Sequence, residues 1–189
     1  MGLVDEIKAD KAAGTRRLVA EYGNRLYETA IRLCIREADA EDYVFRTFEK
    51  AVSRIAQFKG RSSLFTWMYE IMVNIIRTDA RRKGANALVF QENLPEREDT
   101  APDAGAALDA KIEAVAIKYA IDALPLHLRS VVVFRYYEDM SIREIAKVLS
   151  LPEGTVKRRL HDAKLSMREK IARTIRPEAS SNTNGDIED

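Results

Sequence analysis

Cysteine, histidine and long apolar runs are all scarce in this chain of 189 residues. Cys34 is the single cysteine, which excludes an internal disulfide framework, and we expect it to be a small core residue. No stretch approaches the ~20 apolar residues that a membrane span needs, so we expect no membrane insertion. Residues 1–11 also lack the apolar core of a signal peptide, which predicts a cytoplasmic location.

The residues that catalysis or metal binding would need are missing as well. His127 and His161 are the two histidines, and neither has a carboxylate or thiol at metal-ligand spacing. There is no glycine-rich phosphate loop and no nucleophile elbow, so nothing supplies a nucleophile, its base and an orienting group. We therefore expect a protein that is not an enzyme and that carries no metal or other cofactor.

Charge is segregated along the chain, although the formal net charge is only +1. Residues 140–176 carry ten Lys and Arg against four Asp and Glu, whereas residues 84–113 carry two against seven. The stretch from residue 177 to 189 has four acids and no base. Such blocks indicate that different segments face different partners.

The basic block contains the pattern of two helices joined by a tight turn. Ser141 and Glu144 can form a capping box, and Pro152 favours a break followed by a new helix. The second helix would bury three residues at helical spacing, Val156, Leu160 and Ala163. This arrangement, with a basic outer face, is typical of the helix-turn-helix motif. An ordinary helical hairpin with a solvated charged face is the alternative.

The basic face of the second helix is a candidate surface for DNA. We expect Lys157, Arg158 and His161 to lie toward base edges. The side chains better placed for phosphates are Arg143, Arg159 and Lys164.

A second candidate for nucleic-acid binding runs from residue 58 to residue 83. It mixes aromatic and basic side chains, namely Phe58, Phe65, Trp67 and Tyr69 with Lys59, Arg61, Arg77, Arg81, Arg82 and Lys83. Aromatic platforms with cations are typical of single-stranded DNA binding, where stacking contributes about 1–3 kcal/mol per base. Core packing is the alternative for the aromatic residues, and stabilisation of a helix C-terminus is the alternative for the cations.

Helical periodicity on both sides of an acidic, proline-containing stretch predicts an all-α protein of two small helical domains joined by a flexible linker. We expect the first domain at residues 1–83, the linker at 84–107, the second domain at 108–176 and a disordered acidic tail at 177–189. No strand alternation of useful length is present.

Several short motifs accompany these two candidate surfaces. In the first half they are Ala-Glu-Asp at 40–42, Phe48 with Ala51, Phe-Lys-Gly at 58–60, Thr-Trp-Met at 66–68, Asn74, and Arg-Arg at 81–82. In the second half they are Leu-Pro at 124–125, Tyr136, Ser-Ile-Arg-Glu-Ile-Ala at 141–146 and the run from residue 152 to 160. Over about residues 15–173 the chain thus resembles regions 2 and 4, in order, of the extracytoplasmic-function (ECF, group IV) sigma factors.

The resemblance implies a sigma factor that binds core RNA polymerase and directs promoter recognition and opening. It implies polymerase docking by Glu41, Asp42, Phe45, Arg46 and Glu49. It implies contact with the single-stranded −10 element by Phe58, Lys59, Gly60, Arg61, Ser62, Trp67, Asn74, Arg77, Arg81 and Arg82. Contact with the duplex −35 element is implied for Arg143, Thr155, Lys157, Arg158, Arg159, His161 and Lys164. An anti-sigma factor is implied as a further partner.

The chain departs from the family pattern at two places. Residues 43–46 read Tyr-Val-Phe-Arg where the family usually has Leu-Val-Gln-Glu, and Ser150 stands where the family usually has glycine. A left-handed Ser150 would cost on the order of 1 kcal/mol. Two other functions stay open at this point. One is a free-standing, dimeric helix-turn-helix regulator on a palindromic operator, and the other is a sigma-like module that sequesters an anti-sigma factor.

Overall fold

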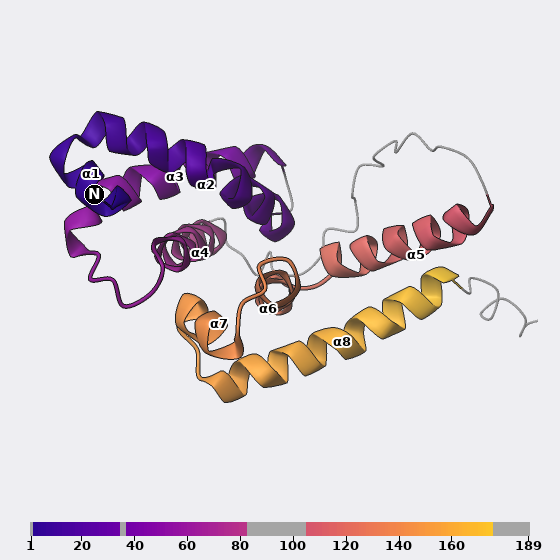
Figure 1. Cartoon of the computed structure of the whole chain (residues 1–189). Helices are drawn as coiled ribbons and strands as arrows, with labels where there is room; N and C mark the ends of the chain where they lie inside the picture. The colour runs from indigo at the N-terminus through magenta and orange to yellow at the C-terminus, as the bar shows by residue number, and fades with distance from the viewer. Residues whose placement is uncertain (1, 35–36, 83–104, 176–189) are drawn as a thin grey trace, which may run out of the picture.

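The computed structural model describes residues 2–34, 37–82 and 105–175, and all of its regular structure there is helical (Figure 1). The helices are α1 (Leu3–Ala9), α2 (Lys11–Leu33), α3 (Glu37–Ser53), the 3₁₀ turn η1 (Ile55–Gln57), α4 (Leu64–Arg82), α5 (Gly105–Asp122), α6 (Leu126–Tyr136), α7 (Ile142–Leu149) and α8 (Glu153–Ile175). The all-α prediction is therefore confirmed. None of the described helices is long and apolar enough to cross a membrane.

The first four helices form an N-terminal unit, residues 2–82, around α4. Asp10 caps α2 by accepting hydrogen bonds from the backbone N–H groups of Ala12 and Ala13 at 2.9 and 3.0 Å. The inner face of α4 is fully buried at Met68 and Met72. Helix α3 packs on both α2 and α4. The face of α4 that these helices cover is buried from Phe65 to Ile76.

The last four helices form a C-terminal unit, residues 105–175. Its two long helices, α5 and α8, run side by side (Figure 1). Small side chains are buried on both helices, namely Ala116 and Ala120 on α5 and Ala163 on α8. The shorter α6 and α7 pack between α8 and the N-terminal unit.

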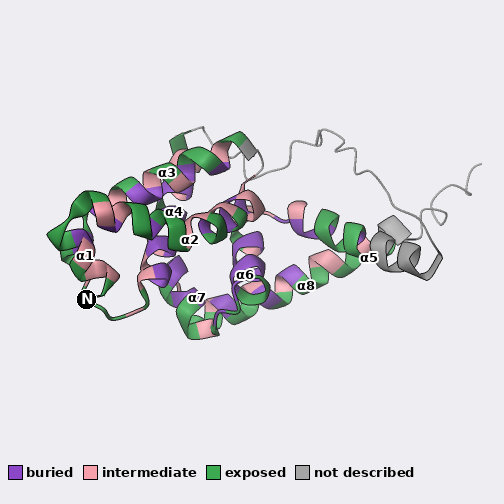
Figure 2. Ribbon diagram, turned by 45° about the horizontal axis from the view of Figure 1, so that its top comes forward, coloured by how far each residue is buried: buried purple, intermediate pink, exposed green. Residues whose placement is uncertain are grey.

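The two units share a large hydrophobic core, and a smaller second cluster of Ile121, Leu124, Val132 and Ala163 lies within the C-terminal unit. Buried side chains of α4, α6 and α7 belong to a single cluster. Figure 2 colours the buried residues of these helices purple. Within this cluster the rings of Tyr69 and Phe134 meet edge to face, with centroids 5.1 Å apart. Helix α4 packs on α7, and α2 packs on α6. These contacts make the core continuous between two units that the sequence predicts to be separate domains.

The predicted linker and tail lie almost wholly outside the described residues. Helix α5 begins at Gly105, three residues before the predicted start of the second domain at 108. Helix ends vary by one or two residues between definitions, and Ala106 and Ala107 are good helix formers, so this extension is physically ordinary.

Candidate nucleic-acid and partner-binding surfaces

The helix-turn-helix is built as the sequence predicts. The backbone N–H of Glu144 donates to the Ser141 hydroxyl at 3.3 Å, and the Glu144 carboxylate accepts from the backbone N–H of Ser141 at 2.9 Å. Ser150 then takes a left-handed conformation with φ 52° and ψ 51°. This residue ends α7 and turns the chain toward α8, which starts after Pro152.

The basic face of α8 is open to solvent. Val156, Leu160 and Ala163 are buried as predicted, which orients the opposite face outward. The exposed members of the predicted −35 set are Lys157, Arg158, His161, Lys164 and, on α7, Arg143, whereas Thr155 and Arg159 are half-buried. The Arg158 side chain is 83% exposed, and its Nε lies 3.8 Å from the Asp162 carboxylate within the same helix. A weak surface pair of this kind leaves the guanidinium available for DNA.

The loop between η1 and α4 frames a small cavity. Ser63 caps α4 by accepting from the backbone N–H of Thr66 at 3.0 Å, and Gly60 has a left-handed φ of 68°. The rings of Phe58 and Trp67 lie 5.3 Å apart, tilted by 47°. The cavity has a volume of about 180 Å³ and is lined by Gln57, Phe58, Lys59, Arg61, Ser62, Trp67, Glu70 and Lys147. Five residues of the predicted −10 set therefore meet at one cavity.

Three residues of this cavity were not anticipated from the sequence. Glu70 lies one turn after Trp67 on α4, so helical spacing could have found it. Its Oε1 atom is buried without a hydrogen-bond partner, and burial raises the pKa of its carboxyl, opposed by the charge of Lys147. Lys147 comes from α7 and donates to the Arg61 carbonyl at 3.2 Å, a contact across 86 positions that no local pattern indicates. Gln57 completes the set from the 3₁₀ turn.

Of the other members of the −10 set, Gly60 lies in the loop before α4, and Asn74, Arg77, Arg81 and Arg82 lie farther along α4. Asn74 is exposed and does not line the cavity, although it stands one turn beyond Glu70. Arg77 donates to the Leu149 carbonyl of α7 at 2.9 Å, and burial, with Arg159 and Arg81 nearby, lowers its pKa. Arg81 and Arg82 are exposed at the end of the helix.

Two of the candidate aromatic platforms are core residues. Phe65 is 7% exposed and Tyr69 is fully buried, and their ring centroids are 4.4 Å apart. Their hydrophobic surface is used against α2 and α6, where Phe65 stacks on Tyr22 and Tyr69 meets Phe134. Of the four candidate aromatics, Phe58 and Trp67 remain available for stacking on a base.

Helix α3 carries the residues predicted to dock on polymerase. Glu41, Asp42, Phe45 and Glu49 are exposed, with Phe45 71% exposed. Arg46 differs, because its guanidinium donates to both oxygens of Asp79 on α4, at 2.7 and 3.2 Å, and to Asp42 at 2.9 Å. These hydrogen bonds raise the pKa of Arg46. Arg46 therefore connects α3 to α4, whereas the neighbouring Phe45 side chain is exposed to solvent on the outer face of α3.

No cluster of three or more His, Cys, Asp or Glu residues that could hold a metal ion occurs in the part of the chain that the structure describes. The described residues form three exposed features: the basic face of α8, the cavity beside Phe58 and Trp67, and the exposed acidic and aromatic side chains of α3. All three are surfaces for binding.

Comparison with known proteins agrees with this arrangement. Residues 18–86 match the family described as Sigma-70 region 2, and residues 114–167 match Sigma-70, region 4. The RNA polymerase sigma-H factor of Pseudomonas aeruginosa is 27% identical over 184 residues, which covers 93% of both chains. The ECF sigma factor SigW of Bacillus subtilis is 25% identical over 179 residues, covering 89% of this chain and 94% of SigW.

A solved structure gives the same fold. It is the sigma factor RpoE in complex with the anti-sigma factor NepR from Bartonella quintana, with a TM-score of 0.65 at 21% identity, covering 83% of this chain and 96% of RpoE. The two family matches together span more than half of the chain, which thus belongs to the sigma-70 family. Within that family it is an ECF sigma factor, a protein that directs transcription initiation, and sigma factors as a family are not enzymes.

Proposed function

We propose that this sigma factor divides its work among the three surfaces described above. Helix α3 docks on core RNA polymerase through Glu41, Asp42, Phe45 and Glu49, and α7 with α8 reads the −35 duplex. The cavity beside Phe58 and Trp67 captures one unpaired base of the −10 element. Because polymerase and chromosomal DNA lie in the cytoplasm, we infer that location for the protein.

The observation that carries this proposal is the small aromatic cavity on the same chain as a helix-turn-helix. A volume of about 180 Å³ is below the ~300–1,000 Å³ of sites for drug-sized ligands, so the cavity suits one small planar group. Extruding a base from a duplex costs a few kcal/mol. Stacking on an aromatic ring contributes about 1–3 kcal/mol per base and can offset much of that cost. Lys59 and Arg61 at the cavity would attract the adjoining phosphates.

An anti-sigma factor is the second proposed partner. RpoE, which shares this fold, was solved with its anti-sigma factor NepR. Exposed apolar side chains are available on several helices here, among them Phe45 on α3 and Tyr119 on α5. A partner that covered Phe45 would block the surface proposed to dock on polymerase.

Permanganate footprinting with reconstituted holoenzyme tests base capture. Run-off transcription on a pool of genomic fragments first supplies a duplex promoter. Asn74→Ala should leave helicity and polymerase affinity nearly unchanged, because Asn74 is exposed. We expect open-complex formation to fall about tenfold, because Asn74 lies on the face of α4 that continues from the cavity and a lost hydrogen bond is worth roughly that factor. Phe58→Leu should have a similar effect by removing the stacking surface.

Asn24→Ala is the matched control, since Asn24 is an exposed amide on α2 away from the cavity. A promoter already melted at the −10 element should restore part of the loss, because its unpairing is already complete. Equal thymine reactivity with the wild type and with both variants on the duplex promoter would refute base capture. Failure to obtain any run-off product would favour a module that only sequesters an anti-sigma factor.

A further inference from the structure

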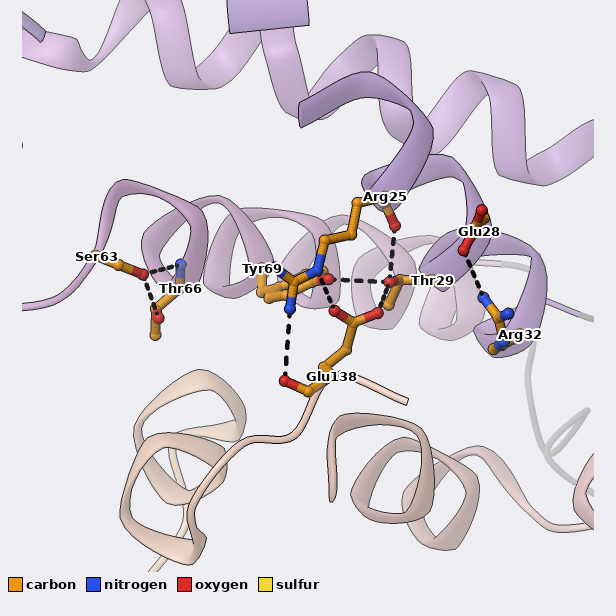
Figure 3. A network of polar contacts seen from close by, with 8 residues as sticks. All are labelled: Arg25, Glu28, Thr29, Arg32, Ser63, Thr66, Tyr69 and Glu138. Atoms are coloured by element: carbon orange, nitrogen blue, oxygen red, sulfur yellow. Dashed lines mark hydrogen bonds and ion pairs between the residues drawn. The ribbon is translucent and has the colours of Figure 1, made fainter. Parts of the chain in front are cut away.

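Asp162 is an acidic side chain on the basic face of α8. Two other carboxylates of the C-terminal unit, Glu138 and Glu144, are used inside the fold. Glu138 accepts a hydrogen bond from Arg25 Nε at 2.8 Å (Figure 3), and Glu144 belongs to the capping box of α7. Asp162 differs, because its side chain is 45% exposed and lies 3.8 Å from Arg158 Nε in a surface pair. Since pairs of this kind add little to stability, stability does not account for an acid at this position.

The helix geometry places Asp162 on the side of α8 that faces away from the core. The buried stripe of α8 consists of Val156, Leu160 and Ala163. Successive residues of an α-helix turn by about 100°, so Arg158 lies almost opposite the centre of that stripe. His161 and Asp162 lie about 60° and 40° to either side of Arg158. These three side chains form the central row of the exposed face.

Cations occupy the two edges of the same face. Lys157 and Lys164 lie along one edge, and Arg159 lies along the other. When a helix enters the major groove, its central row is closest to the base edges and its two edges are closest to the phosphates. Asp162 therefore faces the bases, whereas a carboxylate at either edge would meet the negative charge of the backbone.

The titratable neighbours of Asp162 leave its negative charge available. Arg158 is 83% exposed and touches Asp162 only at 3.8 Å, so its guanidinium can turn to a base. His127 of α6 is the other neighbour. Burial and the charge of Arg159 lower the pKa of His127, against the opposing charge of Asp162, so this imidazole is neutral at pH 7. His127 thus supplies no positive charge to compensate the carboxylate.

An ionised carboxylate only accepts hydrogen bonds, and this property selects among the bases. In the major groove, cytosine presents its N4 amino group as a donor, whereas guanine presents the two acceptors N7 and O6. Adenine presents a donor beside an acceptor, and thymine presents an acceptor beside a methyl group. Cytosine is therefore the base whose edge offers a donor without an acceptor. Guanine and thymine would place an acceptor against the carboxylate.

We propose that Asp162 is a specificity-determining residue of the −35 reader, which accepts a hydrogen bond from the N4 amino group of one cytosine. Arg158 reads a guanine nearby, since a guanidinium pairs with guanine N7 and O6. The two residues are about 6 Å apart along the helix, and base pairs rise by about 3.4 Å, so the cytosine lies one or two base pairs from that guanine. This inference rests on the proposed function, because it requires α8 to read the −35 duplex.

The test measures binding of reconstituted holoenzyme to a pool of duplex promoters that are randomised at the −35 element and identical elsewhere. With the wild type, one position should favour cytosine over guanine and thymine by about tenfold or more. Asp162→Asn has nearly the same size, but its amide both donates and accepts, which suits adenine N7 and N6. It should therefore shift the preference at that position from cytosine to adenine. Asp162→Glu should retain the preference for cytosine.

Asp162→Ala separates base reading from a merely structural role. It should abolish the preference at that position and strengthen binding to promoters that lack the cytosine, because the repulsion between the carboxylate and the DNA is lost. A residue that only oriented Arg158 would instead alter the position that Arg158→Ala alters. The matched control is Glu169→Gln, an exposed acid about two turns further along α8, which should leave the preference profile unchanged.

The possible outcomes distinguish this inference from the proposed function. The inference would be overturned by unchanged profiles for Asp162→Asn and Asp162→Ala, or by a change confined to the position that Arg158→Ala alters. A wild-type preference for any base other than cytosine at the affected position would also overturn it. In each of these cases −35 recognition by α8 would stand. A wild-type holoenzyme without any −35 preference would overturn both the −35 reader and the role of Asp162.

Discussion

Ser150 holds a backbone conformation that disfavours its side chain. Its φ of 52° is left-handed, which costs a non-glycine residue roughly 1–2 kcal/mol. Glycine at this position would relieve the strain. It would also increase the conformational entropy of the unfolded chain, which lowers the free energy of unfolding by roughly 0.5–1 kcal/mol. We therefore predict that Ser150→Gly raises the free energy of unfolding by about 0.5–1 kcal/mol, as measured by urea denaturation. Ser166→Gly inside α8 is the control and should lower it, by about 0.5 kcal/mol or more. A destabilised Ser150→Gly would contradict the strain argument.

Arg158 and Lys164 occupy the same exposed helix face but should act differently on DNA. If Arg158 reads a base edge, Arg158→Ala costs about 1–3 kcal/mol and relaxes preference at one or two base pairs. Lys164→Ala should weaken binding evenly across sequences and reduce the salt slope by about one unit. Holoenzyme binding to a −35 library at several salt concentrations measures both effects. An unchanged preference profile for Arg158→Ala would remove Arg158 from base recognition.

At the scale of single elements, the start of α7 depends on an ionised carboxylate. Hydrogen bonds from the Ser141 hydroxyl and backbone N–H lower the pKa of Glu144. A lowered folded-state pKa means that the contribution is present at neutral pH and is lost as the pH falls through that value. Ser141→Ala should therefore lower the free energy of unfolding by about 1 kcal/mol at pH 7, and by less at pH 3. Urea denaturation at the two pH values checks this, and an equal loss at both would contradict it.

The pairing of α3 with α4 rests on the Arg46–Asp79 brace. Hydrogen bonds to charged groups contribute about 1.5–3 kcal/mol, and the Asp79 side chain is only 15% exposed. Arg46→Ala should therefore lower the free energy of unfolding by roughly 1.5–3 kcal/mol in chemical denaturation. The Asp42 carboxylate accepts from the same Arg46 Nη1 but its side chain is 56% exposed, so Asp42→Asn should cost less than about 1 kcal/mol. If Arg46→Ala proved neutral for stability, Arg46 would be free to act at the polymerase surface instead.

For the whole molecule, the shared core predicts cooperative unfolding. Tyr69 and Phe134 are fully buried against each other across the junction, so unfolding of either unit exposes core side chains of the other. Calorimetry of the free chain should show one transition, with equal calorimetric and van't Hoff enthalpies. Val156→Ala, in the core of the C-terminal unit, should lower the single transition temperature by a few degrees. Two separate transitions in the wild type would show that the units are energetically independent.

The sequence alone determined the features that depend on neighbours along the chain. The capping box at Ser141 and Glu144 and the basic outer face of α8 follow from spacing within one or two helical turns. Their physical basis is local, because backbone hydrogen bonds and helical periodicity connect residues a few positions apart. The family resemblance rested on the same short motifs and was confirmed.

The tertiary structure alone decided which residues meet across the fold. Glu138 binds Arg25, which is 113 positions away, and Lys147 reaches Arg61 over 86. It also assigned Phe65 and Tyr69 to the core and Arg46 to a brace between helices. Periodicity shows which face of a helix is apolar, but it does not show which other helix covers that face. That choice is made by packing over the whole chain, because many distant pairings bury similar apolar area and only their combined fit selects one.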